Sequence, residues 1–220
     1  GQARSVAMLW IALSLAFAWL AIRELLSPWS REHPQPIEPL YLLLVTALAV
    51  AFAWPPVSTW RFERFLESRA RLLTEGRPVS VHCNTLLDTM LDPNALAAGH
   101  ANLATGRIVL QKPWCSTLQA YLDDPASADE RGEQILNLFT HEVMHVRGLL
   151  DERVTECHAV QYNRRMAELL GVPAALALDH ARRYYRESYA QRAEVGGHAG
   201  AYVSPECAPR KALDLRLPHA

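Results

Sequence analysis

Residues 130–151 read ERGEQILNLFTHEVMHVRGLLD, and this stretch decides how the surrounding region folds. The pattern is helical from Ala128 onward and carries apolar residues on both sides of a polar centre. It predicts a helix over Glu130–Arg147, and Gly148 is well placed to end that helix in the left-handed conformation. Asp151 follows as a cap for a second helix, predicted over residues 152–170.

The centre of the first helix carries the run His141-Glu142-Val143-Met144-His145. Residues four apart stand on one face of a helix, so the two histidines can present their imidazoles to one metal ion. Neutral imidazole is a standard zinc ligand. Glu142, next to the first histidine, can act as a general base toward a metal-activated water. The spacing therefore predicts a metal site with a catalytic carboxylate beside it.

A third ligand must come from outside this run, and three acids follow it closely. If the two helices are antiparallel with their turn near residue 150, residues that face one another have numbers that sum to about 300. The metal would lie between His141 and His145, close to residue 143, and would therefore face residue 157. This geometry favours Glu156 as the third ligand. Glu152 lies about one turn (5.4 Å) too high, and Asp151 is the remaining alternative.

The run and the acids after it resemble those of zinc-dependent metallopeptidases of the HExxH zincin type, in particular the gluzincins. In that clan a second helix supplies a glutamate to zinc, and an acid one turn later holds a ligand histidine. The resemblance thus implies Glu152 as the ligand and Glu156 as its support. A weaker resemblance to the HExxHxxGxxD pattern of metzincins implies Asp151 instead.

The zincin resemblance also implies a cofactor, a reaction and further parts of the site. The cofactor is Zn2+, and the reaction is hydrolysis of peptide bonds by zinc-activated water. A strand edge near Asn102 would line the substrate groove. A donor to the reacting carbonyl would come from the third helix, with the 182–185 run and Tyr189 as candidates.

The first 57 residues differ sharply from the rest because they are nearly all apolar. Residues 5–22 and 40–57 each hold eighteen residues without a charge, which is enough to cross a bilayer as a helix. A solvated connector over residues 23–39 would join them. We expect a transmembrane hairpin over residues 1–57 and integration in the lipid bilayer.

Beyond the hairpin we expect a charged juxtamembrane stalk over residues 58–77 and a zincin-like domain over residues 78–195. Short strands are predicted at residues 79–83 and 100–111, with a turn at Thr105-Gly106. Helices are predicted near residues 85–90, 114–122 and 174–193. The fold class is therefore α+β, a small sheet followed by helices. Residues 196–220 are expected to form an extended tail.

The side of the membrane that the domain occupies is left open, because two signals disagree. Four arginines follow the second span and only two lie in the connector, which favours the cytoplasm. All four cysteines, however, lie in the domain and are candidates for disulfides: Cys83, Cys115, Cys157 and Cys207. Cys207 lies in a proline-rich tail, and Cys157 is its first predicted partner. This gives a slight preference for the extracytoplasmic side.

The net charge of −1 and the lack of a Lys/Arg stripe argue against a nucleic-acid partner. The expected partners are a peptide or protein substrate and the bilayer, and the oligomeric state is left open. We predict a membrane-anchored zinc metallopeptidase, an endopeptidase with Glu142 as general base. The alternative is a non-catalytic zincin-like module that binds metal or senses a ligand beside a membrane partner.

Overall fold

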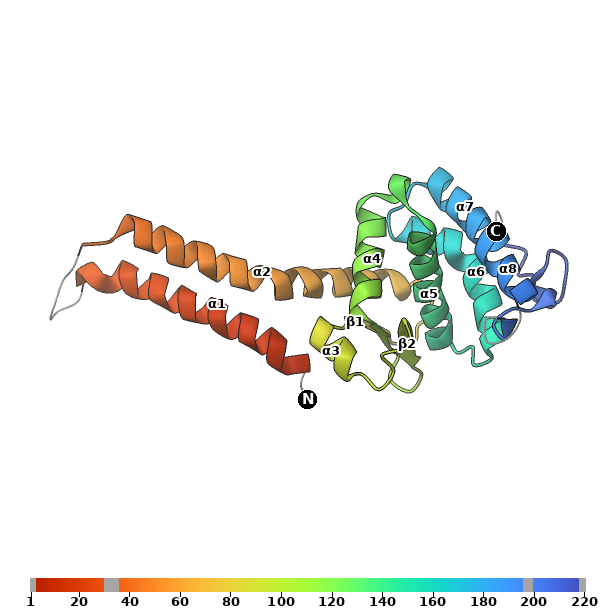
Figure 1. The fold of residues 1–220 in the computed structure, drawn as a ribbon, viewed down its shortest axis with the longest axis horizontal. Coiled ribbons are helices and arrows are strands. Elements are labelled where there is room, and N and C mark those ends of the chain that lie inside the picture. The colour runs from red at the N-terminus through yellow and green to blue at the C-terminus, as the bar shows by residue number, and fades with distance from the viewer. Residues whose placement is uncertain (1–2, 30–35, 196–199, 218–220) are drawn as a thin grey trace. The chain divides into compact units, whose positions relative to one another are not determined.

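The chain folds as a mixed α+β protein that is mostly helical (Figure 1). The computed structural model describes residues 3–29, 36–195 and 200–217. It divides into two compact units, Gly1–Phe62 and Glu63–Ala220.

The first unit contains two apolar helices, and the second of them continues past Phe62. Helix α1 covers Ala3–Leu26 and continues into a 3-10 turn, and α2 covers Pro39–Ala70. Within the unit, the Ser14 hydroxyl donates to the Ala49 carbonyl at 2.9 Å, and the rings of Phe17 and Phe52 stack.

Both helices are long and apolar enough to cross a membrane. Most of their large apolar side chains are exposed, such as Leu43 and Trp54. An exposed apolar surface of this extent is typical of segments that meet an apolar environment. Helix α2 contains both the predicted span 40–57 and the charged residues that follow it. Part of the predicted connector, residues 30–35, lies outside the described residues.

The second unit contains a three-stranded sheet in the order β1-β3-β2. Strand β1 (Ser80–Cys83) is parallel to β3 (Arg107–Leu110), and β2 (Gly99–Asn102) pairs with β3 in the antiparallel sense. The β2–β3 turn ends at Gly106, where φ is +67° and an added Cβ would lie 2.0 Å from the Pro78 carbonyl oxygen. Because β2 is last in the strand order, it is an edge strand, and α5 packs against it.

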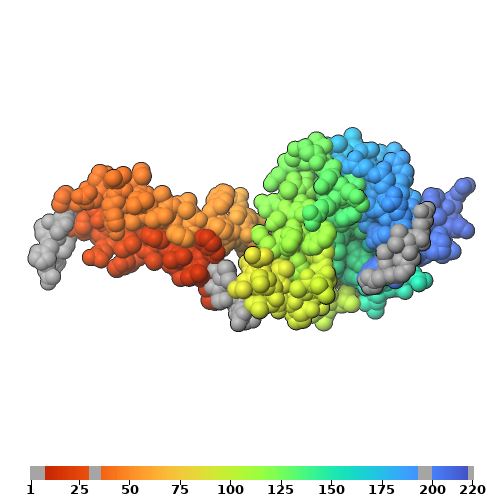
Figure 2. All heavy atoms as spheres, in the orientation of Figure 1, coloured from red at the N-terminus to blue at the C-terminus, as the bar shows by residue number. Residues whose placement is uncertain are grey.

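Helices make up the rest of this unit. The helices that follow the sheet or interrupt it are α3 (Leu86–Leu91), α4 (Lys112–Asp123), α5 (Glu130–Arg147), α6 (Glu152–Leu169), α7 (Ala174–Arg183), a π-helical stretch η3 (Tyr184–Tyr189) and α8 (Ala190–Val195). The last three run without a break where a single third helix was predicted. Helices α4 and α7 are linked by a buried contact, in which the Tyr121 hydroxyl lies 3.0 Å from His180 Nδ1. Figure 2 shows green atoms of the first helices after the sheet beside blue atoms of the later helices.

Two disulfides connect parts of the second unit that are far apart in sequence. Cys83 of β1 is joined to Cys115 of α4, and Cys157 of α6 is joined to Cys207. The second is the pair that the sequence favoured for Cys207. Cys207 is buried, whereas its neighbours Pro205 and Glu206 are exposed.

Candidate metal centre

Local capping signals bring α5 and α6 together at one end. Helix α5 starts at an Asp129 cap, whose carboxylate accepts from the Gly132 amide, and it ends at Gly148. Gly148 has φ of +116°, and a Cβ there would lie 2.7 Å from the Arg77 guanidinium. Three residues later, the Asp151 carboxylate accepts from the amides of Arg153 and Val154 and starts α6. This short connection places the first turn of α6 beside the last turns of α5.

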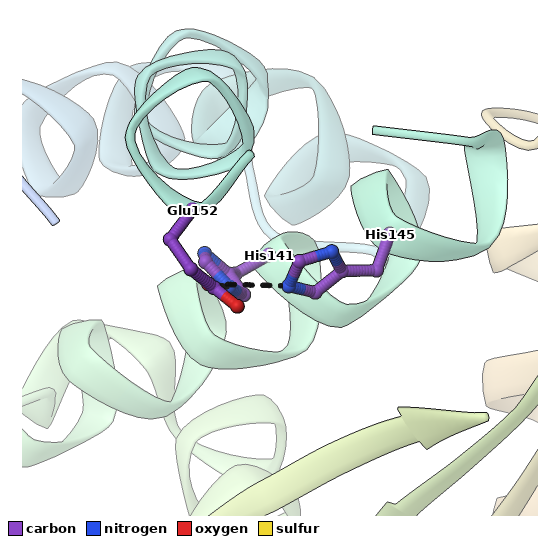
Figure 3. A group of neighbouring side chains, drawn as sticks. All are labelled: His141, His145 and Glu152. Carbon is purple, nitrogen blue, oxygen red and sulfur yellow. Dashed lines mark hydrogen bonds and ion pairs between the residues drawn. The ribbon is translucent and has the colours of Figure 1, made fainter. Parts of the chain in front are cut away.

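Three side chains converge at this junction (Figure 3). His141 and His145 project from α5 on one face, and Glu152 reaches them from the first turn of α6. The Glu152 carboxylate oxygen lies 3.1 Å from His141 Nε2 and 3.3 Å from His145 Nε2. Ligand atoms about 2 Å from a tetrahedral ion lie roughly 3.3 Å apart. Both distances fit a single bound ion, and all three ligand atoms lie within 4.8 Å of one another.

The opposite nitrogens of both histidines explain why the Nε2 atoms suit a metal. His141 Nδ1 lies 2.8 Å from a Glu156 carboxylate oxygen, and His145 Nδ1 lies 2.8 Å from the Leu149 carbonyl. Both partners are acceptors, so each Nδ1 carries a proton, and in the neutral imidazole Nε2 then carries the lone pair. Those lone pairs face the carboxylate of Glu152, a third acceptor. Positive charge is needed between these atoms, and either a proton on an Nε2 atom or a divalent cation supplies it.

Glu142 lies next to this cluster and is buried. Burial raises the pKa of Glu142 to about 7, against the opposing effect of His141. The backbone amide of Ala101 in the edge strand β2 hydrogen-bonds to its carboxylate. A carboxylate with a pKa near neutrality can both accept and release a proton at physiological pH.

Beneath His141 lies a buried polar network centred on Glu156. Its second carboxylate oxygen accepts from Asn137 Nδ2 at 2.9 Å, from Arg192 at 2.6 Å and from the Tyr184 hydroxyl at 3.3 Å. Burial raises the pKa of Glu156, but the hydrogen bond from His141 and the charge of Arg192 outweigh it and hold the pKa low. The same bond and the charge of Glu156 outweigh burial at His141 and raise the pKa of that imidazole.

The sequence preference for Glu156 as third ligand does not match this geometry. Glu156 is bonded to the Nδ1 side of His141, whereas Glu152 faces the Nε2 atoms of both histidines. Glu152 therefore takes the place of Glu156 as the third candidate ligand, and the gluzincin resemblance stays a prediction. Asp151 serves as the N-cap of α6 and is not among the three converging side chains.

The cluster opens into a cleft of about 820 Å³. One wall is the edge strand β2 with the residues before it, and another is formed by η3 and α8. The face of α5 from Glu130 to His145 lines the cleft between them. Asn102, predicted to line a groove, instead accepts hydrogen bonds from the Ala104 and Thr105 amides in the β2–β3 turn.

Three of the predicted donors on the third helix have other partners, although Tyr184 also lines the cleft. Tyr184 bonds to Glu156, Tyr189 bonds to Ser204, and Arg183 pairs with the buried Glu133. Tyr202 lines the cleft as well, with its ring centroid 6.0 Å from that of His141. Burial and then the charges of Glu152, Glu142 and Glu156 raise the pKa of its phenol. The sequence analysis did not single out Tyr202. The predicted pairing of Cys207 with Cys157 was the only signal in the sequence that this segment is attached to the domain.

Comparisons with protein-family models, with curated proteins and with solved structures find no match to this chain. The site is therefore interpreted from its own residues and their geometry.

Proposed function

We propose that this chain is a membrane-anchored zinc metallopeptidase of the HExxH zincin type, related in arrangement to the gluzincins. The observation that carries the proposal is the convergence of three ligand atoms on one point beside a buried Glu142 at the wall of a cleft. A purely structural metal site has no use for a carboxylate in that position and usually closes all four positions with protein ligands.

The ion would be held by His141, His145 and Glu152. Two imidazole nitrogens and one carboxylate oxygen form a donor set of the zinc hydrolases, in which one position stays open to water or substrate. When bound, zinc would make a water molecule acidic enough to attack near neutral pH and would polarise the substrate carbonyl.

The chain's own residues would then move the proton and orient the ligands. Glu142 accepts a proton from the attacking water and delivers it to the nitrogen of the leaving amine, so water adds across the C–N bond. Glu156 and the Leu149 carbonyl keep His141 and His145 in the tautomer that directs Nε2 to the ion. The strand β2 ties its Ala101 amide to Glu142, and its edge can hold an extended peptide by backbone hydrogen bonds.

Membrane anchoring by α1 and α2 is supported by their length and exposed apolar surface. An oxidising location for the second unit is supported by its two disulfides, which are rare in reducing compartments. We therefore place the second unit on the extracytoplasmic side, against the arginine count. Thiol labelling of intact cells without reductant tests this location. We expect the four cysteines to be unreactive, and four reactive cysteines would contradict an oxidising location.

Metal analysis of the purified full chain in detergent, combined with a peptide-library cleavage assay, tests the proposed function. We expect about one zinc per chain and cleavage that Glu142→Gln removes, because an amide cannot accept the proton. General-base catalysis contributes roughly 100-fold to 10,000-fold, so the loss should exceed 100-fold. The variant should keep its zinc.

Glu130→Gln is the matched control, because it makes the same change in an exposed acid on the same helix and cleft. It should bind zinc and cleave peptides like the unaltered chain. Iron in place of zinc, or cleavage by Glu142→Gln within tenfold of the unaltered chain, would contradict the proposal. A full zinc load with no cleavage of any peptide would favour the non-catalytic module.

A further inference from the structure

The C-terminal segment 200–217 is built into the second unit by contacts along its whole length. The Cys157–Cys207 disulfide fixes it to α6. Gln161 of the same helix donates to the Leu213 carbonyl at 2.9 Å and accepts from the Leu215 amide at 2.7 Å. Around the disulfide, Val203 and Leu213 pack on a buried cluster that also holds Tyr184 and Tyr189 of η3. The segment thus shares its packing with the helices that support Glu156.

Two anchors lie on either side of Tyr202 within this segment. Before it, the Ala201 carbonyl accepts from Arg153 Nε at 3.3 Å, in the first turn of α6 beside Glu152. After it, the Ser204 amide donates to the Tyr189 hydroxyl at 3.2 Å. The backbone at residue 202 is held from both sides, and the Tyr202 ring lies against the ring of the candidate ligand His141.

We propose that Tyr202 contacts the substrate of the hydrolytic site and that the segment 200–217, held by the Cys157–Cys207 disulfide, positions it there. This inference rests on the proposed function. Tyr202 lines the same cleft as Glu142 and the cluster of ligand atoms. A phenol is a hydrogen-bond donor at neutral pH. Its hydroxyl donates to the substrate carbonyl oxygen, on which negative charge develops as water attacks.

The disulfide makes the position of Tyr202 depend on oxidation of the chain. Cys157 is the neighbour of Glu156 on α6, so the tether begins beside the network that supports His141. Breaking the bond leaves only the hydrogen bonds and packing to hold the segment, and with it Tyr202 at the cleft. The other disulfide, Cys83–Cys115, joins β1 to α4, and neither cysteine lines the cleft. The two bonds therefore provide a matched pair for an experiment.

The experiment compares the zinc-loaded full chain with Tyr202→Phe, Tyr202→Ala, Cys207→Ser and Cys115→Ser. The readouts are kcat and KM for a cleaved peptide and the rate of zinc release to a chelator. Loss of one donor to a developing charge costs about 100-fold to 1,000-fold in kcat. Tyr202→Phe should show that loss in kcat with an unchanged zinc release rate. Cys207→Ser should lose activity similarly and release zinc faster, and Cys115→Ser should do neither while it stays folded.

The outcomes separate this inference from the proposed function. Cleavage by Tyr202→Phe within threefold of the unaltered chain overturns the substrate contact. Equal losses in Cys207→Ser and Cys115→Ser overturn the positioning role, because they would reflect stability alone. If the unaltered chain cleaves nothing, the proposed function and the substrate contact fail together. The rate of zinc release then still tests the placement of Tyr202 beside His141. Tyr202→Ala uncovers His141 and should speed zinc release, so an unchanged rate overturns that placement.

Discussion

The two sides of His141 face carboxylates of the same helix in very different surroundings. On the inner side, Nδ1 meets Glu156, whose side chain is 3% exposed and is bonded to Asn137, Tyr184 and Arg192. On the outer side, Nε2 meets Glu152, whose side chain is 50% exposed. Every partner of Glu156 is a donor, whereas the atoms that meet Glu152 are acceptors once each Nδ1 carries its proton.

In the proposed metal site, this difference separates a supporting carboxylate from a ligand. The inner group is electrically satisfied by protein atoms, since the buried charge of Glu156 is paired with Arg192 and hydrogen-bonded throughout. The outer group brings two imidazole nitrogens and a carboxylate oxygen to one point, and neither Lys nor Arg is among these three residues. A cation at that point would stabilise the outer side, and the inner side would orient His141 toward it.

The largest effect on zinc binding is expected from His141→Ala, because His141 contacts Glu156 through Nδ1 and Glu152 through Nε2. The variant should lose nearly all of its zinc, since the ion keeps only one imidazole and one carboxylate. Elemental analysis of the purified chain measures this. His180→Ala is a suitable control, because His180 is also buried and hydrogen-bonded but lies outside the cleft. Zinc at full load in His141→Ala would contradict the outer-side assignment.

The next effect is expected from Glu152→Ala. Loss of an anionic ligand should weaken zinc binding by more than about 100-fold, the upper end for a supporting residue. The zinc dissociation constant from competition with a chelator measures this in the full chain. Glu130→Ala removes an acid from the same cleft and should leave the constant unchanged. A smaller effect for Glu152→Ala than for Glu156→Gln would reverse the two roles.

Much of the helical part of the fold follows from signals local in sequence. Gly148 and Asp151 mark the end of α5 and the start of α6, and the structure has both features at those residues. The hairpin of β2 and β3 turns at Gly106, as the Thr105-Gly106 pair indicates. The convergence of His141 and His145 follows from their four-residue spacing alone.

The third candidate ligand was harder to predict, because the pairing of residues across two antiparallel helices describes only their backbones. That pairing holds, since Asn137 faces Asn163 and His141 faces Glu156 across the helices. An imidazole, however, offers two nitrogens on opposite edges of the ring. The converging Nε2 atoms lie toward the turn between the helices, where the flexible side chain of Glu152 reaches them. Which edge faces an ion depends on rotamers and tautomers, which residue spacing does not encode.

The C-terminal segment could not be placed from sequence because nothing periodic marks it. It contains a short 3-10 turn, Pro205–Cys207, and otherwise irregular backbone. Its position depends on contacts distant in sequence, such as that of Gln161 with Leu215. Tyr202 reaches the cleft through this tertiary packing. The predicted tail also includes residues 196–199 and 218–220, which lie outside the described residues.

A moderate effect is expected from Glu156→Gln, which tests the inner side. The amide keeps one acceptor oxygen and has a donor in place of the other, so either His141 Nδ1–H or the donors Asn137, Tyr184 and Arg192 lose their acceptor. Zinc affinity should fall about 10-fold to 100-fold, as for other supporting partners of metal ligands. Glu168→Gln is the control on the same helix, because Glu168 pairs with Arg164 far from the cluster. Unchanged zinc affinity in Glu156→Gln would show that the network does not orient His141.

The smallest effect is expected from Asp151→Ala, because Asp151 caps α6 and does not join the cluster. Its carboxylate accepts from the amides of Arg153 and Val154 at 3.0 Å, and loss of such a cap costs about 1 kcal/mol of stability. Chemical denaturation of the zinc-free chain measures that cost, and Asp151→Asn should restore most of it, since asparagine caps nearly as well. Zinc affinity should stay close to that of the unaltered chain in both variants, because the next residue, Glu152, supplies the ligand. If Asp151→Ala instead weakens zinc more than Glu152→Ala does, the ligand is Asp151. The metzincin-like interpretation of the run from His141 to Asp151 would then replace the gluzincin-like one.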